Sequence, residues 1–149
     1  MTTFRVQRHT GRSVTDAWAA VTDFAAHGDV VPATRMRLDP GTPTVGWRFA
    51  AGTGLGPATL WDHMIVTKWQ PPTADGDEAV VAIVKIGAWL RGWAQIAIEP
   101  DGEGARVTWT EELGPRVDPL PRLTGPASAT AGQWLFGRTL DALLASPAG

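Results

Sequence analysis

The chain has 149 residues, of which 44% are hydrophobic and 19% charged, so one core suffices and we expect a single domain over residues 1–149. The formal net charge of −2, from 13 basic and 15 acidic residues spread along the chain, argues against a nucleic-acid partner. The absence of cysteine excludes disulfides, thiolate metal sites and a cysteine nucleophile.

The N-terminal part of the chain predicts a strand followed by a short helix. Residues 4–8 alternate apolar and polar side chains, which is the period of a half-buried strand. Ser13 is a residue type that caps helices, and apolar residues at helical spacing follow it. We therefore expect an amphipathic helix over residues 14–23, with a further turn over residues 24–28.

The central part of the chain predicts a series of strands, because apolar and β-branched runs alternate with turns rich in glycine, proline and aspartate. Consecutive strands with such short connections are typical of an antiparallel meander. The expected strands cover residues 35–38, 45–51, 60–69, 79–86, 89–98 and 105–113.

A glycine-rich segment, AGTGLGPATLW at residues 51–61, has the appearance of a phosphate-binding loop. Such a loop needs a helix that starts directly after the glycines and directs its N–H groups at the anion. Here Pro57 and a predicted strand follow, and no lysine stands in the P-loop position. The segment therefore predicts a bend between two strands.

The C-terminal part predicts a long amphipathic helix over residues 129–144, with Phe136 and Leu140 on its apolar side. Trp134 falls on the polar side together with Arg138, and a homodimer contact through Trp134 is one hypothesis for its role. Whether residues 120–126 form a loop or a first helical segment kinked at Pro126 stays open.

Four segments carry a resemblance that covers nearly the whole chain: VTDAWAAVTDF at residues 14–24, the loop reaching residues 31–32, DHMIVTKWQPP at residues 62–72 and RVTWTEE at residues 106–112. With the element order β-α-β6-α, the chain resembles the SRPBCC superfamily, which includes polyketide cyclase/dehydrase-like proteins. The resemblance implies an α+β, START-like helix-grip fold, in which a curved antiparallel sheet of about seven strands wraps around a long C-terminal helix. It also implies a hydrophobic cavity between sheet and helix, used in different members for lipids, sterols or aromatic polyketides. It carries no catalytic signature.

Side chains alternate along a strand, so the apolar phase of each strand should face the helix and any cavity. In the strand 60–69 this phase contains Leu60, Asp62, Met64 and Val66, while the opposite phase, with Trp61, Ile65 and Trp69, stays open as an alternative. In the strand 45–51 it contains Val45, Trp47, Phe49 and Ala51. The residues expected to bind a ligand are Trp47, Phe49, Asp62, Met64, Trp109, Glu111, Phe136 and Leu140.

Two carboxylates, Asp62 and Glu111, fall on the apolar phase of their strands and are the candidate catalytic residues. A buried acid costs several kcal/mol unless it is paired, hydrogen-bonded or protonated, so either could protonate or bind a ligand oxygen. The structural alternative is that Glu111 pairs with an arginine and Asp62 accepts hydrogen bonds from backbone amides of the glycine-rich segment. If both acids titrate near their ordinary pKa values of about 3.9 and 4.3, the catalytic hypothesis fails.

The three histidines, His9, His27 and His63, lie in different predicted elements without metal-ligand spacing. We expect surface or capping roles for them, and neither a bound metal nor a cofactor.

The patterns leave three functions open. The first is binding of a small hydrophobic molecule, lipid-like or like an aromatic polyketide, in the expected cavity. The second is a polyketide cyclase/dehydratase that uses acid/base catalysis. The third is a protein-interaction module whose cavity is filled by its own side chains.

No apolar run approaches the roughly 18 residues of a membrane helix, so we expect a cytoplasmic protein without membrane insertion.

Overall fold

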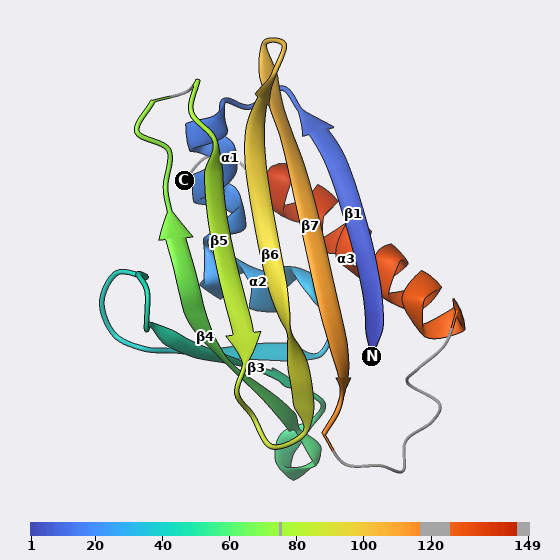
Figure 1. Cartoon of the computed structure of the whole chain (residues 1–149). Coiled ribbons are helices and arrows are strands. Elements are labelled where there is room, and N and C mark those ends of the chain that lie inside the picture. The colour runs from blue at the N-terminus through green and yellow to red at the C-terminus, as the bar shows by residue number, and fades with distance from the viewer. Residues whose placement is uncertain (75, 117–125, 146–149) are drawn as a thin grey trace.

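The structure is a computed structural model, and it describes residues 1–74, 76–116 and 126–145. These residues form a curved antiparallel sheet and three α-helices (Figure 1). In chain order the elements are β1 (Thr2–Thr10), α1 (Val14–Val21), α2 (Phe24–Val30), β2 (Thr34–Leu38), β3 (Arg48–Thr53), the 3₁₀ helix η1 (Gly56–Ala58), β4 (Leu60–Gln70), β5 (Ala79–Lys85), β6 (Leu90–Asp101), β7 (Gly104–Pro115) and α3 (Pro126–Ala145).

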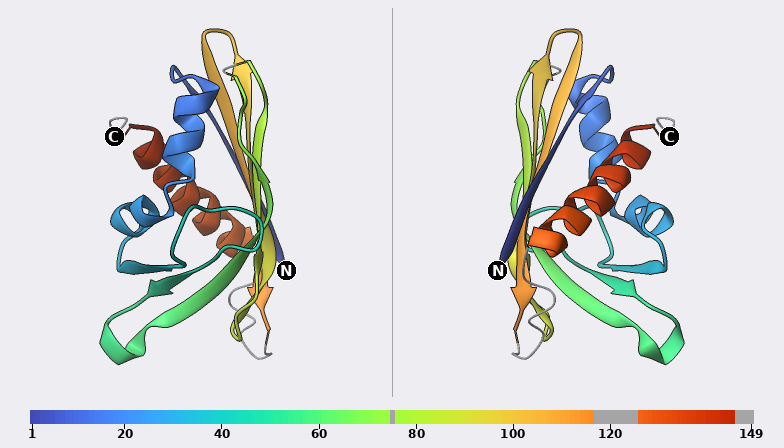
Figure 2. Two further views of the ribbon diagram at one scale, coloured as in Figure 1. Left: turned by 90° about the vertical axis from the view of Figure 1, so that its left-hand side faces the viewer. Right: turned by 90° about the vertical axis from the view of Figure 1, so that its right-hand side faces the viewer.

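The seven strands follow the order β1-β7-β6-β5-β4-β3-β2, so β2 to β7 form the predicted meander and β1 closes it against β7. The pairing of β1 with β7 runs from Thr2 opposite Leu113 to Thr10 opposite Ala105. All three helices lie over the concave face of the sheet (Figure 2). The predicted α+β helix-grip fold is therefore confirmed.

Helix α3 lies close to the sheet at its glycines and aromatic residues. The rings of Phe4 and Phe136 stack with centroids 4.8 Å apart, and a Cβ at Gly132 would lie 3.0 Å from the Phe4 ring. Trp134 projects into solvent on the other side of the helix, with the Arg138 guanidinium 5.1 Å from the ring centroid. The helix begins at Pro126, and residues 120–125, for which a loop or a helical segment was expected, lie outside the described residues.

The N-terminal helical region consists of two helices: the helix predicted over residues 14–23 ends earlier, at Val21, and the further turn expected over residues 24–28 is part of the separate helix α2. The Ser13 hydroxyl accepts a hydrogen bond from the Asp16 amide and caps α1, as expected. The Thr22 hydroxyl then donates to the Trp18 carbonyl, and the Asp23 carboxylate caps a second helix by accepting from the Ala26 amide. This break turns α2 across the sheet, where it becomes part of the site described below.

Strand β3 begins at Arg48, later than predicted, and this corrects the expected inward position of Val45. Gly46 has a positive φ of 89° and Trp47 donates a backbone hydrogen bond to Thr44, so this stretch is a turn. Val45 is 60% exposed, whereas Trp47 and Phe49 are buried as predicted.

Strand β4 changes the face that its side chains present. The predicted inward phase is correct from Leu60 to Val66, but the pairing with β5 shifts between Val66 and Lys68. One extra residue at this bulge reverses the alternation. Trp69, placed outward in the preferred phase, therefore packs edge-on against Trp18 with ring centroids 4.9 Å apart.

The glycine-rich segment is the connection between β3 and β4, as predicted. Gly54 has a φ of 128°, which favours glycine, and its amide donates to the Ala33 carbonyl. Only the three-residue helix η1 follows before β4. The segment has no helix that could hold a phosphate.

Candidate functional site

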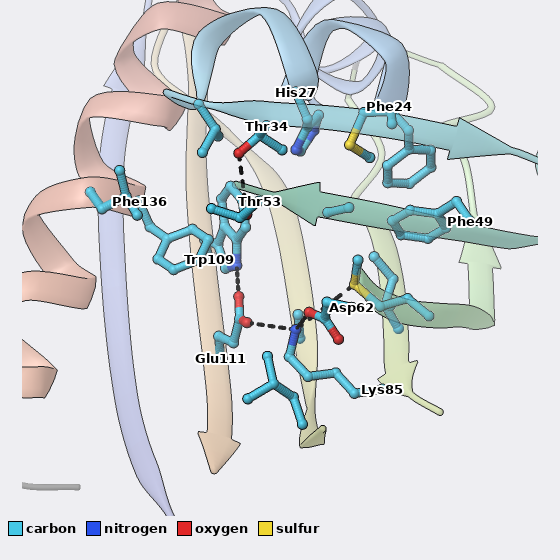
Figure 3. A pocket seen from close by; sticks show the side chains of 18 of the residues that line it. Phe24, His27, Thr34, Phe49, Thr53, Asp62, Lys85, Trp109, Glu111 and Phe136 are labelled. Carbon is cyan, nitrogen blue, oxygen red and sulfur yellow. Dashed lines mark hydrogen bonds and ion pairs between the residues drawn. The ribbon is translucent and has the colours of Figure 1, made fainter. Parts of the chain in front are cut away.

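A cavity of about 220 Å³ lies between the sheet and helices α2 and α3 (Figure 3). Its walls are aromatic, with Phe24 and Phe49 on one side and Trp109 and Phe136 on the other. Aliphatic side chains and methionines line the rest of the cavity wall. Leu60, at the start of β4, is exposed and also lines the cavity, so the cavity reaches the surface at this point.

One end of the cavity carries three charged side chains from three strands. Lys85 on β5 donates a hydrogen bond to Asp62 Oδ2 on β4, and its Nζ lies 3.2 Å from Glu111 Oε1 on β7. Ala94 on β6 pairs with Glu111 in the sheet and also lines the cavity. Because alanine is small, the Lys85 side chain can reach across β6 to Glu111.

This cluster is held away from water. The exposed fraction of the side chain is 5% for Lys85, 4% for Glu111 and 15% for Asp62. Burial opposes the charge on Lys85, but the attraction of Glu111 and Asp62 outweighs it and raises the pKa of Lys85. Burial raises the pKa of Glu111, and the charges of Lys85 and Asp62 act on it in opposite directions. A charged Lys85 paired with one carboxylate, while Glu111 holds a proton more readily than usual, avoids an excess buried charge.

The remaining polar atoms of the cluster are partnered, with one exception. Trp109 Nε1 donates to Glu111 Oε2 over 3.1 Å, and Lys85 Nζ also approaches Met64 Sδ at 3.9 Å. Asp62 Oδ1 is buried and has no hydrogen-bond partner within the described residues. A buried acceptor without a partner costs free energy, so this atom is available to an additional donor.

His27 on α2 also lines the cavity, which the sequence did not predict, while its bond to the Val21 carbonyl at the end of α1 is a capping contact, one of the two roles expected for it. Its Nε2 donates to the Val21 carbonyl over 2.9 Å, and its ring lies 5.6 Å from that of Phe24 and 5.9 Å from that of Trp109. Burial lowers the pKa of His27, more than the Val21 hydrogen bond and the charge of Asp23 raise it. The ring is therefore neutral at pH 7.

The lowered pKa of His27 makes stability depend on pH. The folded state binds the proton less readily than the unfolded state, whose ordinary value is 6.5, so the free energy of unfolding falls as pH drops through and below 6.5. In His27→Gln we expect this decrease to be smaller, in urea unfolding measured between pH 8 and pH 5. The exposed His63→Gln variant is the control, and an equal decrease in both variants would contradict the assignment.

Six of the eight expected ligand-binding residues line the cavity: Phe49, Asp62, Met64, Trp109, Glu111 and Phe136. Trp47 does not, because it packs behind the wall, 5.5 Å from the Phe24 ring and 5.6 Å from the Phe49 ring. Leu140 does not either, because it lies one turn beyond Phe136 on α3, within the hydrophobic core. The binding roles of all eight residues stay predictions.

The partners expected for the two acids were wrong, because both acids contact Lys85 in place of an arginine or backbone amides. Sequence reasoning missed Lys85 itself. The signal was present in the strand AVVAIVK, where Lys85 shares its phase with the buried Ala79, Val81 and Ile83. Among the described residues, no group of three or more histidines and acids is placed to hold a metal ion.

The family model described as polyketide cyclase/dehydrase and lipid transport matches residues 1–146. The chain belongs to this family. The predicted membership of the SRPBCC superfamily is thereby confirmed. A search of curated proteins gives no match.

Solved structures share the family's fold at low sequence identity. Protein TTHA0849 from Thermus thermophilus has a TM-score of 0.73 at 13% identity, covering 95% of this chain and 94% of its own. A STAR-related lipid transfer protein from Xanthomonas axonopodis has a TM-score of 0.67 at 15% identity, covering 92% and 82%. Ara h 8.0201 has a TM-score of 0.61 at 14% identity, covering 97% and 98%.

Among the helices that the structure describes, none has the length and apolar character of a membrane span.

Proposed function

We propose that this protein binds a small hydrophobic molecule in the cavity between the sheet and helices α2 and α3. The observation that carries the proposal is an open cavity of about 220 Å³ with aromatic walls and polar groups at one end. Ligand sites typically combine apolar walls with a few polar groups that orient the ligand. The family's description, which includes lipid transport, supports the same function.

The open volume of the cavity supports an occupant. Its walls are largely apolar, so a hydrophobic ligand that fills it would remove apolar surface from water. The same open volume argues against an interaction module with a filled cavity. A protein without a ligand would gain stability from a larger side chain at a small position such as Ala51, which lines the cavity away from Glu111.

Native mass spectrometry of the freshly purified protein tests the proposal. We expect a bound small molecule that leaves when the protein unfolds, and we expect Ala94→Leu to reduce its occupancy at least about tenfold, because added methylenes overfill the site. Ala97→Leu is the matched control, since residue 97 lies on the same strand but outside the cavity. A ligand-free mass, together with no thermal stabilisation by 2-methoxynaphthalene or a monoacylglycerol, would contradict the proposal.

A cyclase/dehydratase activity is the second candidate, and the raised pKa of Glu111 beside the cavity favours it. A protonated Glu111 could donate to a ligand oxygen while the walls hold a reactive chain in a folded conformation. Loss of water from a short poly-β-ketone thioester, followed by mass spectrometry, separates this activity from binding alone. An unchanged rate in Glu111→Gln would exclude Glu111 as the acid.

A further inference from the structure

We infer that the ligand of this cavity is an uncharged compound of one or two rings, which donates a hydrogen bond from a hydroxyl group to Asp62 Oδ1. The inference rests on the proposed function, because it names the chemical class of the ligand for the same site.

The hydrogen-bond capacity of the charged cluster determines which polar group fits. An ammonium group has three donors, and those of Lys85 face Asp62 Oδ2, Glu111 Oε1 and the more distant Met64 Sδ. The indole N–H of Trp109 is used by Glu111 Oε2. The N–H groups of the cluster are therefore all used, and none is free for a ligand that can only accept hydrogen bonds.

The acceptor side of the cluster is different. Asp62 lines the cavity, and its Oδ1 is buried without a partner within the described residues. His27 on the opposite wall is neutral, and its single N–H donates to the Val21 carbonyl. It therefore has no N–H left to donate to a ligand. A ligand hydroxyl can donate this missing hydrogen bond to Asp62 Oδ1 without adding charge.

The balance of charge excludes ionised ligands. The cavity end already holds two carboxyl groups and a single ammonium group, all largely shielded from water. A ligand carboxylate would bring a third acid next to Asp62, and a ligand ammonium would have to leave water for a carboxylate that Lys85 already pairs. Either ion would lose hydration that the site does not replace, so an uncharged ligand is selected.

The volume limits the size of the ligand. An apolar cavity of roughly 150 Å³ holds benzene, and sites for drug-sized ligands begin at about 300 Å³. At about 220 Å³ this cavity lies between these values. Each wall has a pair of aromatic rings in contact with each other and provides a flat surface. The ring centroids are 4.5 Å apart for Phe24 and Phe49 and 4.8 Å apart for Trp109 and Phe136. A compound of one or two rings fits this volume better than a sterol or a complete lipid.

Three naphthalene derivatives of similar shape test the inference by calorimetric titration at pH 7. 2-Naphthol has a hydroxyl donor, 2-methoxynaphthalene lacks the donor, and 2-naphthoate is an anion. We expect 2-naphthol to bind about tenfold more tightly than 2-methoxynaphthalene, as for one hydrogen bond to a buried charged acceptor. We expect 2-naphthoate to bind at least about 100-fold more weakly than 2-naphthol.

The Asp62→Asn variant tests whether Asp62 is the residue that accepts the ligand's hydrogen bond. We expect the preference for 2-naphthol over 2-methoxynaphthalene to fall to about threefold or less, since a hydrogen bond to a neutral acceptor is weaker. Affinity for 2-methoxynaphthalene should stay within about twofold of the wild-type value. Glu112→Gln, on β7 but outside the cavity, is the control that should retain the full preference.

The wild-type series decides the inference even if Asp62→Asn does not fold. Binding of 2-methoxynaphthalene or 2-naphthoate as tightly as 2-naphthol would overturn the inference and still support a hydrophobic-ligand site. Binding of none of the three would also overturn it, and the native mass spectrum would then decide the proposed function on its own.

Discussion

Replacing Lys85 with methionine is expected to lower the free energy of unfolding by about 3–5 kcal/mol, the usual effect of removing one partner from a buried ionic cluster. The variant keeps most of the side-chain volume but leaves Asp62 and Glu111 largely buried without a cation. Urea unfolding at pH 7, followed by tryptophan fluorescence, measures the change.

The pH dependence identifies the cause of this loss. Without the Lys85 charge, the remaining acids should hold protons more readily in the folded than in the unfolded state. The free energy of unfolding should then fall as pH rises above about 4.5, so the loss at pH 5 should be smaller than at pH 7. Adding Asp62→Asn and Glu111→Gln to Lys85→Met should recover much of the stability, because neutral amides replace the unpaired acids.

The control for Lys85 is the exposed Lys68 on β4. We expect Lys68→Met to change the free energy of unfolding by less than about 0.5 kcal/mol. Two results would contradict this explanation: equal effects of the two lysine substitutions, or a loss of stability in Lys85→Met that does not vary with pH. Either would show that Lys85 does not stabilise the fold through the buried ionic cluster.

Replacing Leu140 with alanine is expected to lower the free energy of unfolding by about 2–5 kcal/mol, as for other fully buried leucines. Leu140 has an exposed fraction of 0% and belongs to the core cluster that joins α3 to the sheet. Because Leu140 lies outside the cavity lining, the affinity of the folded variant for 2-naphthol should change less than its stability. Urea unfolding and calorimetric titration measure the two quantities separately.

Trp134→Ala on the same helix is the matched control, because Trp134 is 62% exposed. Its contact with Arg138 is a surface cation–π interaction, for which about 0.5–1 kcal/mol is typical. A loss for Leu140→Ala no larger than that for Trp134→Ala would mean that α3 is not held on the sheet through this position.

The sequence predicted the fold well, because the signals for it are local. Alternation and turn residues locate the strands, and helical spacing locates α3. The same alternation placed Asp62 and Glu111 on the concave face, where both line the cavity. Strand phase depends on neighbouring residues while the strand stays regular, so it was predicted correctly up to Val66 but not beyond the bulge that follows.

The predictions that failed concern positions that depend on packing between distant segments. Lysine is rarely buried unless it is paired, and the acids that pair with Lys85 come from β4 and β7. The wall position of His27 depends on how α2 crosses the sheet. The position of Leu140 beyond the cavity depends on where α3 meets the core. None of these arrangements has a signature within a few residues of the side chain concerned.

The bulge in β4 also has a consequence for how this protein tolerates substitution. Before the bulge, Asp62 and Met64 line the cavity, whereas after it Trp69 pairs with Val81 and packs against Trp18. One strand therefore lines the cavity in its first half and packs against the core in its second. Apart from Asp62, which pairs with Lys85, the cavity-lining positions of the first half can change without altering the packing of Trp69 on Trp18, so such a sheet lets the cavity diverge over evolution while the fold is retained.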